Sequence, residues 1–313
     1  MKILELTYNN NSEKLFSVVA KEPWSMFLDS GFPNINTGRF DIITARPSVT
    51  LETYGKKTHI KSLDRETTSE DDPLDLVREN LGNQEDNLSG LPFCGGAIGY
   101  FSYDLCRRLE KLSDKTEQKI DMPDMAIGIY DWSIIVDHHV KRTWLVSYNR
   151  FDSTKLIWQD LYELFSSMPV EDDHSYTINS KILSNLSKQD YEKAFNRIKK
   201  YIRDGDCYQV NFAQHFSAEF QGNTWSAYQQ LRKSNPAPFS AYINLPEGSV
   251  LSSSPERFLS LINNQVETKP IKGTKHRSVF AYEDKELASL LLKSEKDRAE
   301  NLMIVDLLRN DIS

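Results

Sequence analysis

Phe239-Ser240-Ala241-Tyr242-Ile243 is a short apolar and aromatic run, and the turn residues Pro246-Glu247-Gly248 follow it closely. Asn263-Asn264 marks a second turn before the pattern ends at Thr268. Short β-prone runs separated by Gly, Pro and Asn are typical of antiparallel strands joined by hairpins. The stretch therefore predicts a β-meander, and Tyr208–Phe212 is expected to be an earlier strand of the same sheet.

A helix is expected just before the meander. It begins after Ser187, which lies three residues before Asp190 in the manner of a capping box. Apolar residues then recur at helical spacing until Gly205, a typical helix stop. We expect the apolar face of this helix to pack on the sheet. Two further helices are expected at 282–293 and 294–310, both with apolar positions at helical spacing.

The N-terminal half also has the pattern of strands and turns. Apolar runs predict strands at 40–45, 49–54, 125–138 and 143–148, and helices are expected at 73–82 and around 158–165. Glycines in the run Gly95–Gly99 indicate a bulge or a close approach of backbones. This mixture of strands and helices supports an α+β fold class.

The polar stretch Pro169–His174 is the weakest point of the internal organisation. We therefore divide the chain into an N-terminal subdomain, 1–170, and a second unit, 181–313. The last residues, Asn310–Ser313, directly follow a helix with an apolar face. We expect further elements to cover that face, and so expect the sequence to be incomplete at its C-terminus.

Composition excludes several classes of protein. The 313 residues contain 45 acidic and 38 basic side chains, for a net charge of −7, so no general field attracts nucleic acid. No apolar run is long enough to cross a membrane, and the N-terminus lacks a signal-peptide core. Three cysteines without metal-ligand spacing suggest reduced thiols. We expect a cytoplasmic protein.

Two clusters contain residues suited to acid–base or nucleophilic chemistry. Lys272 lies in Pro270–Thr274 (PIKGT), between an apolar strand end and a glycine. A partly desolvated lysine has a lowered pKa and can act as a nucleophile, although a solvated lysine explains the same residues. Glu256 lies at a strand junction, where it could be a general acid or base or could form an ion pair with Arg257.

Two more clusters are less specific. Glu300 lies in the charged beginning of the last helix, where it could be an oxygen ligand for Mg²⁺ or simply favour the helix dipole. The polar residues of Asp206–Asn211, which include Tyr208, could line a site or form the solvated face of a sheet. There is no P-loop, Rossmann, triad or metal-cluster signature.

Taken in order, these segments resemble the chorismate-utilising enzyme family, over essentially the whole chain. The matching segments are Pro92–Gly96 (PFCGG), Asp206–Asn211 (DCYQVN), Ser254–Phe258 (SPERF), Pro270–Thr274 (PIKGT), Asp297–Leu302 (DRAENL) and Arg309–Asp311 (RND). Within the family, a lysine at position 272 resembles the aminodeoxychorismate synthases of folate and p-aminobenzoate biosynthesis, whereas anthranilate synthases carry alanine there. The resemblance implies two intertwined subdomains, with antiparallel sheets packed as a sandwich and helices outside.

The resemblance also implies a role for each matched residue. Lys272 would add to the chorismate ring as the C4 hydroxyl leaves, ammonia would then displace it at C4, and Glu256 would handle the proton of the hydroxyl. Gly273, Thr274 and Tyr208 would bind the substrate, and Glu300 would bind Mg²⁺. The product would be 4-amino-4-deoxychorismate.

A second, amino-acid pocket is implied by segments that flank the sheet. The family's pocket holds tryptophan, as an inhibitor in anthranilate synthases and as a structural ligand in some aminodeoxychorismate synthases. The residues that match it here are Ser30, Arg39, Phe40, Pro238, Phe239 and Ser240.

The family takes its ammonia from a glutamine amidotransferase subunit (component II), and no amidotransferase domain with a nucleophilic cysteine fits in this chain. A separate partner is therefore implied. The family domain continues beyond Arg309–Asp311 into a region that supplies a histidine, a glycine-rich segment and a second acidic Mg²⁺ ligand. We accordingly expect a truncated chain with little or no turnover. The alternatives are an anthranilate synthase component I and a non-catalytic fragment.

Overall fold

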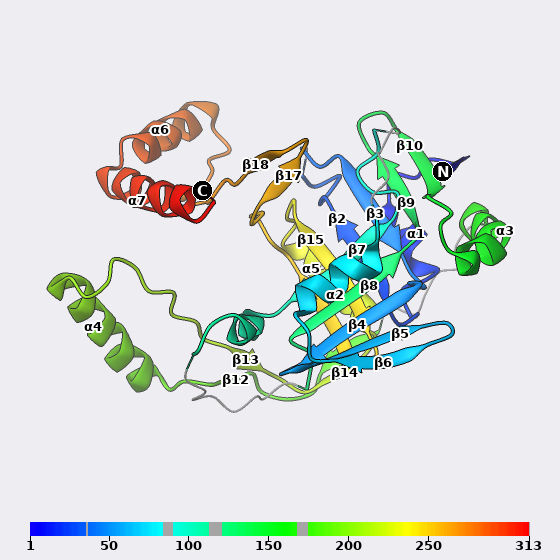
Figure 1. The fold of residues 1–313 in the computed structure, drawn as a ribbon. Helices are drawn as coiled ribbons and strands as arrows, with labels where there is room; N and C mark the ends of the chain where they lie inside the picture. Colours follow the sequence, from blue (N-terminus) through cyan, green and yellow to red (C-terminus); the bar gives the residue numbers. More distant parts are fainter. Residues whose placement is uncertain (36, 84–89, 113–120, 168–174, 313) are drawn as a thin grey trace.

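Two antiparallel β-sheets form the centre of the protein (Figure 1). The computed structural model describes residues 1–35, 37–83, 90–112, 121–167 and 175–312. Within these residues the larger sheet has seven strands in the order β1-β10-β9-β3-β2-β15-β16. Their bounds are β1 (Lys2–Leu6), β2 (Ser25–Asp29), β3 (Phe40–Thr44), β9 (Trp132–Asp137), β10 (Arg142–Ser147), β15 (Ser240–Leu245) and β16 (Gly248–Ser252).

The smaller sheet has five strands among the described residues, in the order β6-β5-β4-β8-β7. Their bounds are β4 (Val49–Tyr54), β5 (Lys57–Ser62), β6 (Glu66–Ser69), β7 (Gly96–Phe101) and β8 (Met125–Tyr130). A single residue, Asp131, separates β8 from β9, so the chain passes there from one sheet to the other. Gly99 of β7 lets this strand lie close to β8, because a Cβ at this position would lie only 1.8 Å from the carbonyl oxygen of Ala126.

The sheets pack face to face. Met26 of β2 and Ile243 of β15, from the larger sheet, share one buried cluster with Ile98 of β7 and Ala126 of β8, from the smaller. Alternate residues of a strand point to opposite faces, so each sheet also has an outer apolar face that must be covered. The predicted sandwich of antiparallel sheets is confirmed.

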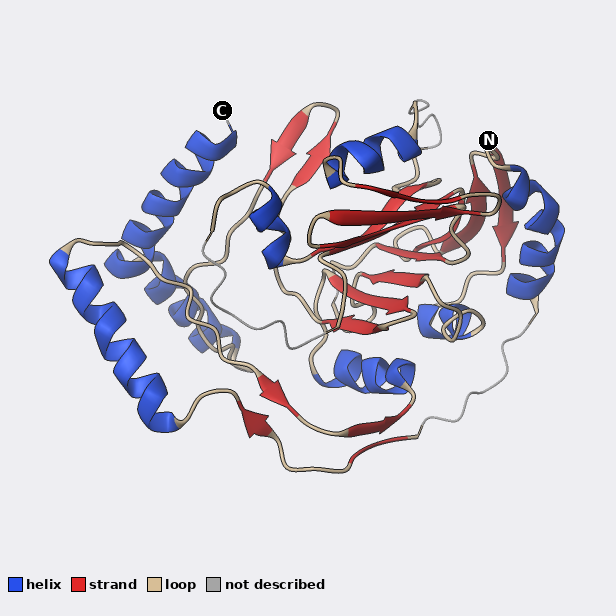
Figure 2. Ribbon diagram, turned by 60° about the horizontal axis from the view of Figure 1, so that its bottom comes forward, coloured by secondary structure: helices blue, strands red, loops and turns tan. Residues whose placement is uncertain are grey.

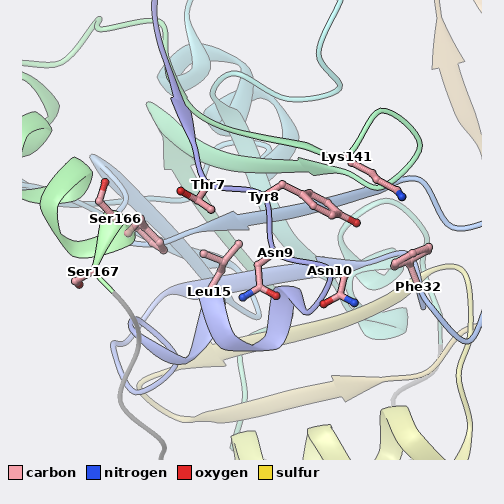
Figure 3. Close-up of a pocket in the computed structure, with 10 residues that line it drawn as sticks. Thr7, Tyr8, Asn9, Asn10, Leu15, Phe32, Lys141, Ser166 and Ser167 are labelled. Carbon is pink, nitrogen blue, oxygen red and sulfur yellow. The ribbon is translucent and has the colours of Figure 1, made fainter.

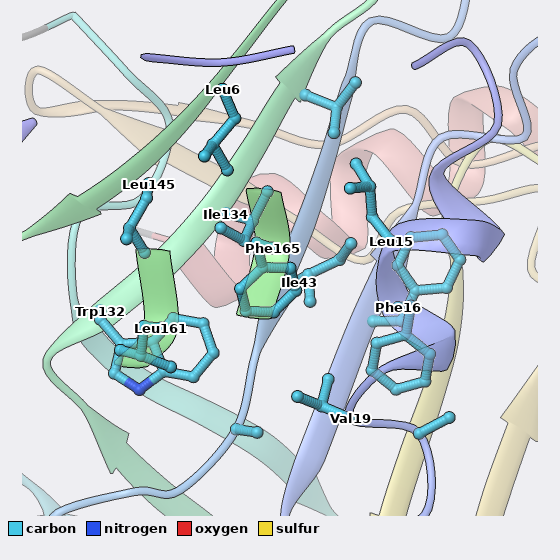
Figure 4. Close-up of a cluster of buried hydrophobic side chains, with 14 of the residues drawn as sticks. Leu6, Leu15, Phe16, Val19, Ile43, Trp132, Ile134, Leu145, Leu161 and Phe165 are labelled. Carbon is cyan, nitrogen blue, oxygen red and sulfur yellow. The ribbon is translucent and has the colours of Figure 1, made fainter. Parts of the chain in front are cut away.

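Helices cover both outer faces. The larger sheet is covered by α1 (Ser12–Ser17), α3 (Asp152–Ser166) and α5 (Thr224–Ser234), and the close-up of this core shows Phe16, Leu161 and Phe165 against strand residues (Figure 4). The smaller sheet packs against α2 (Pro73–Leu81) and the short 3₁₀ helix η1 (Tyr103–Arg108). Four layers result, with the two sheets in the middle.

The C-terminal elements lie outside this sandwich (Figures 1 and 2). They are α4 (Lys188–Asp204), α6 (Ala281–Leu292), α7 (Glu295–Ile312) and three short ribbons. The ribbons pair β11 (Tyr176–Ile178) with β14 (Phe220–Gly222), β12 (Leu183–Ser184) with β13 (Phe216–Ser217), and β17 (Ser260–Ile262) with β18 (Gln265–Glu267). None of the three helices contains a buried residue.

Two expectations about this region are wrong. Tyr208–Phe212 forms no strand, because it has no backbone partner and lies in the loop between α4 and β13. The apolar face of α4 does not pack on the meander, and Phe195 and Ile202 stay 46% and 44% exposed. Only Phe212 of the expected strand contacts the helix, by stacking on Tyr191.

The locally encoded elements are confirmed. Asp72 accepts hydrogen bonds from the first turn of α2, which begins at Pro73, and Ser187 caps α4 by accepting from the backbone of Asp190. Gly205 ends α4 in the left-handed conformation that glycine adopts without strain. The predicted meander contains the hairpins β15–β16 and β17–β18, the second turning at Asn263-Asn264.

Strands from both sides of the expected boundary near residue 170 belong to one sheet. Pro169–His174 lies outside the described residues. On its C-terminal side, β15 and β16 complete the sheet begun by β1 to β3, and α5 covers that sheet. The division into 1–170 and 181–313 remains a prediction about domains. Because strands from both parts form the larger sheet, the core of this sheet belongs to neither part alone.

No helix among the described residues is both long and apolar enough to cross a membrane. Cys94, Cys106 and Cys207 form no disulfide among the described residues.

A carboxyl group at the edge of the sheet interface makes stability depend on pH. Burial, together with the charge and hydrogen bond of Glu247, raises the pKa of Glu52 on β4 to about 7. The folded state therefore binds an extra proton between about pH 4.5 and 7, so its stability falls as pH rises through that window. We expect the fall in unfolding free energy over this window to be about 1–2 kcal/mol smaller in Glu52→Gln, after allowing for solvent screening.

Urea denaturation at pH 5 and pH 8 measures this effect. The exposed helix residue Glu79 provides the matched control, because Glu79→Gln changes the same charge outside the interface. An equal pH dependence of unfolding in Glu52→Gln and the unaltered protein would contradict the prediction.

Candidate functional site

The predicted nucleophile lies in an irregular segment between β18 and α6. Lys272 is half-buried, and the adjacent Gly273 packs against the first turn of α7. A Cβ on Gly273 would lie 2.6 Å from the carboxyl carbon of Asp297, so a larger residue would require that carboxyl group to turn aside. The PIKGT and DRAEN segments are thus brought into contact, and the glycine lets them approach closely.

Glu300, the predicted Mg²⁺ ligand, lies one turn further along α7 than Asp297 and is half-buried. Residues three apart share a helix face, so both carboxylates belong to the side of α7 that meets the lysine segment. No group of three or more potential ligands occurs among the described residues. Mg²⁺ is usually held by one or two carboxylates together with waters and substrate, so Glu300 is able to offer one oxygen ligand, and no chemical step is assigned to the ion.

Glu256, the predicted general acid or base, lies in the exposed loop between β16 and β17. The loop is held by Ser254, whose hydroxyl donates to the Glu256 carbonyl at 2.7 Å. Arg257 does not take the Glu256 carboxylate, because it forms its ion pair with Glu267 at 2.7 Å. The carboxylate of Glu256 is therefore left for solvent or a ligand within the described part of the chain.

Of the two remaining predicted substrate residues, Thr274 lies in the lysine segment and Tyr208 lies on another loop. Tyr208 is 83% exposed in the loop after α4, and Thr274 is exposed beside Gly273. No hydrogen bond or ion pair between described residues connects Lys272 with Glu256, Glu300 or Tyr208. The PIKGT and DRAEN motifs therefore meet at Gly273 and Asp297. Glu256 and Tyr208 lie on other loops.

The residues of the predicted amino-acid pocket, by contrast, lie together. They occupy the ends and loops of three neighbouring strands, β3, β2 and β15, and Ser240 pairs directly with Asp29, which precedes Ser30. The Arg39 guanidinium lies over the Phe40 ring at 4.4 Å. Gly31 permits the loops to meet, since a Cβ on it would lie 2.8 Å from the Ala237 carbonyl oxygen.

A buried polar network under this pocket was not anticipated from the sequence. Asp29 accepts two hydrogen bonds from Arg232, at 2.6 and 3.1 Å, and Asp41 lies 2.8 Å from His138. All four side chains are at least nine-tenths buried. Aspartates inside otherwise apolar strands are the only sequence signal, because a buried carboxylate requires a partner without indicating which one.

Burial and hydrogen bonding act against each other in this network. Burial would raise the pKa of Asp41, but hydrogen bonds from His138, Ser12 and Ser30 outweigh it and hold the pKa below its usual value. Burial raises the pKa of Asp29, and the hydrogen bonds from Arg232 and Gly31 only partly offset that rise. Burial would lower the pKa of Arg232, but its hydrogen bonds to Asp29 and the charge of Glu13 raise it.

A surface cavity of about 610 Å³ has no predicted site residue in its lining (Figure 3). Ten residues line it: Thr7, Tyr8, Asn9, Asn10, Leu15, Phe32, Lys141, Phe165, Ser166 and Ser167. Tyr8 and Phe32 also contact His138 on the buried network. We therefore identify the two candidate sites from the residues around Lys272 and around Ser30, and not from this cavity.

A model of the chorismate binding enzyme family matches residues 26–313, almost the whole chain. The protein belongs to this family.

Similarity to particular proteins is high. The chain is 44% identical to aminodeoxychorismate synthase component 1 of Escherichia coli over 304 residues, covering 96% of this chain and 66% of the relative. It is 32% identical to anthranilate synthase component 1 of Acetivibrio thermocellus, covering 88% of this chain and 59% of that one. The crystal structure of anthranilate synthase component I from Streptococcus pneumoniae superimposes with a TM-score of 0.74 at 29% identity, covering 88% of this chain and 62% of that one. The chain thus spans about two thirds of the length of the first of these relatives.

Proposed function

We propose that this protein acts as an aminodeoxychorismate synthase component I, converting chorismate and ammonia to 4-amino-4-deoxychorismate. The observation that carries the proposal is the 44% identity over 96% of the chain to the Escherichia coli component 1, against 32% to an anthranilate synthase. Lys272, where the resemblance gives anthranilate synthases an alanine, supports the same choice.

Lys272 and Glu256 divide the chemistry in this proposal. The lysine nitrogen forms a bond to the ring while the C–O bond at C4 breaks, and Glu256 gives the departing oxygen a proton so that water leaves. Ammonia then bonds to C4 and the lysine is expelled with its electron pair. Gly273, Thr274 and Tyr208 complete the substrate site in this proposal, and Glu300 would contribute one oxygen ligand to Mg²⁺.

The partner in the proposal is a glutamine amidotransferase subunit, which supplies the ammonia. Component 1 in the names of the relatives supports a second component. The pocket at Ser30, Arg39, Phe40, Pro238, Phe239 and Ser240 is proposed to bind tryptophan.

Product analysis tests the proposal. The protein, purified from its source, is incubated with chorismate, Mg²⁺ and ammonium chloride, and the products are separated by chromatography. We expect 4-amino-4-deoxychorismate, because position 272 is a lysine. Anthranilate as the main product would favour the anthranilate synthase alternative, for which the structural match to the Streptococcus protein is the specific observation. No turnover with either ammonia or an added amidotransferase would favour a non-catalytic role.

A further inference from the structure

The cavity in Figure 3 has a single charged group in its lining. That group is Lys141, in the turn between β9 and β10, and none of the ten lining residues is acidic. Its ammonium forms no ion pair or hydrogen bond with another described residue. A cation without a partner, at a cavity whose lining contains no acid, attracts an anion.

The backbone of Lys141 is in the left-handed conformation, with a φ of 54°. Glycine and asparagine adopt this conformation readily, whereas a long side chain rarely does. Glycine would therefore form the same turn with less strain, and turn geometry alone does not explain a lysine here. Backbone strain of this kind is found preferentially where a side chain meets a ligand.

Neutral hydrogen-bond donors also line the cavity. Asn9 Oδ1 accepts from the backbone N–H of Asn11 at 2.9 Å, so the Nδ2 group of Asn9 remains to donate. The side chains of Thr7, Asn10 and Ser166 form no hydrogen bond with another described residue. Amides and hydroxyls of this kind donate to an anionic oxygen, and such charge-assisted hydrogen bonds are stronger than neutral ones.

The acids nearest to the cavity are already paired. Asp41 lies 2.8 Å from His138, and Asp137 lies 2.9 Å from the guanidinium of Arg39. Burial, together with the charges of Asp41 and Asp137, raises the pKa of Tyr8, so its hydroxyl stays neutral at physiological pH. Tyr8 therefore adds no negative charge that would repel an anion from the cavity.

The rest of the lining is apolar or aromatic. Leu15 and Phe165 are 6% and 4% exposed, and the rings of Tyr8 and Phe32 belong to the same lining. In Figure 3, Phe32 lies toward the end of the cavity where Lys141 lies. A volume of about 610 Å³ exceeds what an inorganic ion needs and falls within the range of small-molecule pockets, roughly 300–1,000 Å³. The ligand must therefore have an apolar body as well as a charge.

We propose that this cavity binds a small aromatic carboxylate, with the carboxylate toward Lys141 and the ring against Phe32 and Leu15. Aromatic rings pack favourably on the faces and edges of other rings, which favours an aromatic body over an aliphatic one. The site shares no residue with the candidate sites around Lys272 and Ser30. The inference is therefore independent of the proposed function.

Two ligands of the same shape test the charge: naphthalene-2-carboxylate and its neutral analogue naphthalene-2-carboxamide. Isothermal titration calorimetry on the unaltered protein is expected to show that the carboxylate binds about fivefold or more tightly, an effect limited by the exposure of Lys141 to solvent. Lys141→Asn removes the cation and keeps a residue that tolerates the left-handed turn. In this variant the carboxylate should lose its advantage, while the carboxamide binds as before.

Lys56→Asn is the matched control, because Lys56 is an exposed lysine in another hairpin turn, between β4 and β5. It should leave both affinities unchanged. The helices α4, α6 and α7 expose apolar side chains that also attract a naphthyl ring. Binding there would not respond to Lys141, so the measured quantity is the ratio of the two affinities.

Asn10→Asp provides a second variant of nearly unchanged shape. It places a negative charge in the lining, so it should weaken the carboxylate about fivefold or more and leave the carboxamide unaffected. Failure of both ligands to bind the unaltered protein, or equal affinities for the two, would overturn the proposal. So would a preference for the carboxylate that persists in Lys141→Asn, or an equal loss of both ligands there, which would indicate a purely structural role.

Discussion

Replacing Lys272 with alanine is expected to remove or redirect the amination of chorismate, with a loss of about 10³-fold or more in the rate of 4-amino-4-deoxychorismate formation. The proposed mechanism divides one difficult substitution into two steps through a covalent bond to this nitrogen, and alanine offers no nucleophile. Any remaining product should contain nitrogen at a different ring position. The measurement is the rate and identity of products from chorismate and ammonium chloride.

The fold should survive this change. Lys272 is only half-buried and makes no hydrogen bond or ion pair within the described part of the chain. Lys275→Ala is the matched control, because it removes an exposed lysine three residues further along the same segment. We expect the thermal midpoints of both variants to match that of the unaltered protein, and only Lys272→Ala to lose amination. Equal product and rate in Lys272→Ala would show that the lysine is not the nucleophile.

Gly273 lets the lysine segment lie close to α7. A Cβ at this position would meet the Asp297 carboxyl group at 2.6 Å, so an alanine would require that side chain to turn aside. The sequence shows the glycine and the charged helix start as separate motifs 24 residues apart. In the structure, the glycine and the start of the helix are in contact.

Local signals predicted those parts of the fold that depend on neighbouring residues. Asp72 before Pro73, Ser187 before Asp190 and the turn Asn263-Asn264 all encode their elements within a few residues, and each is confirmed. Tyr208–Phe212 has the composition of a strand but no partner strand beside it. Strand formation depends on such distant partners, and single-sequence patterns do not identify them.

The same reasoning explains which parts of the site were found. The motifs at Lys272, Glu256 and Glu300 were identified through resemblance, because their residues are contiguous in the chain. The ion pairs beneath the amino-acid pocket join residues that are far apart: 97 positions separate Asp41 from His138, and 203 separate Asp29 from Arg232. No spacing rule connects such pairs, although a buried aspartate predicts that some partner exists.

Replacing Arg232 with methionine is expected to cost about 3–5 kcal/mol of unfolding free energy. The guanidinium neutralises Asp29, whose side chain is fully buried, and also bonds Glu13 at 3.2 Å. Methionine fills a similar volume, so the loss comes from leaving two carboxylates without their cation. Since whole domains are stable by only about 5–15 kcal/mol, the expected shift in the urea midpoint is large.

Arg142→Met is the matched control for the loss of an arginine. Arg142 pairs with Glu5 on the surface at 2.7 Å, and both side chains are about half exposed, so its removal should change the urea midpoint little. The double variant Arg232→Met with Asp29→Leu separates charge from packing. It should recover part of the loss, because one of the unpaired carboxylates is gone. Equal midpoints for Arg232→Met and Arg142→Met would contradict the prediction.

Arg232 also connects stability with ligand binding. Besides Asp29 and Glu13, it donates to the carbonyl oxygen of Phe32, in the loop that follows Ser30. Asp29 accepts from the backbone N–H of Gly31 at 2.7 Å, so the same ion pair fixes both sides of that loop. Arg232→Met should therefore also weaken the binding of L-tryptophan at the proposed amino-acid pocket, because it loosens the loop that follows Asp29. An unchanged tryptophan affinity in isothermal titration calorimetry would contradict this expectation.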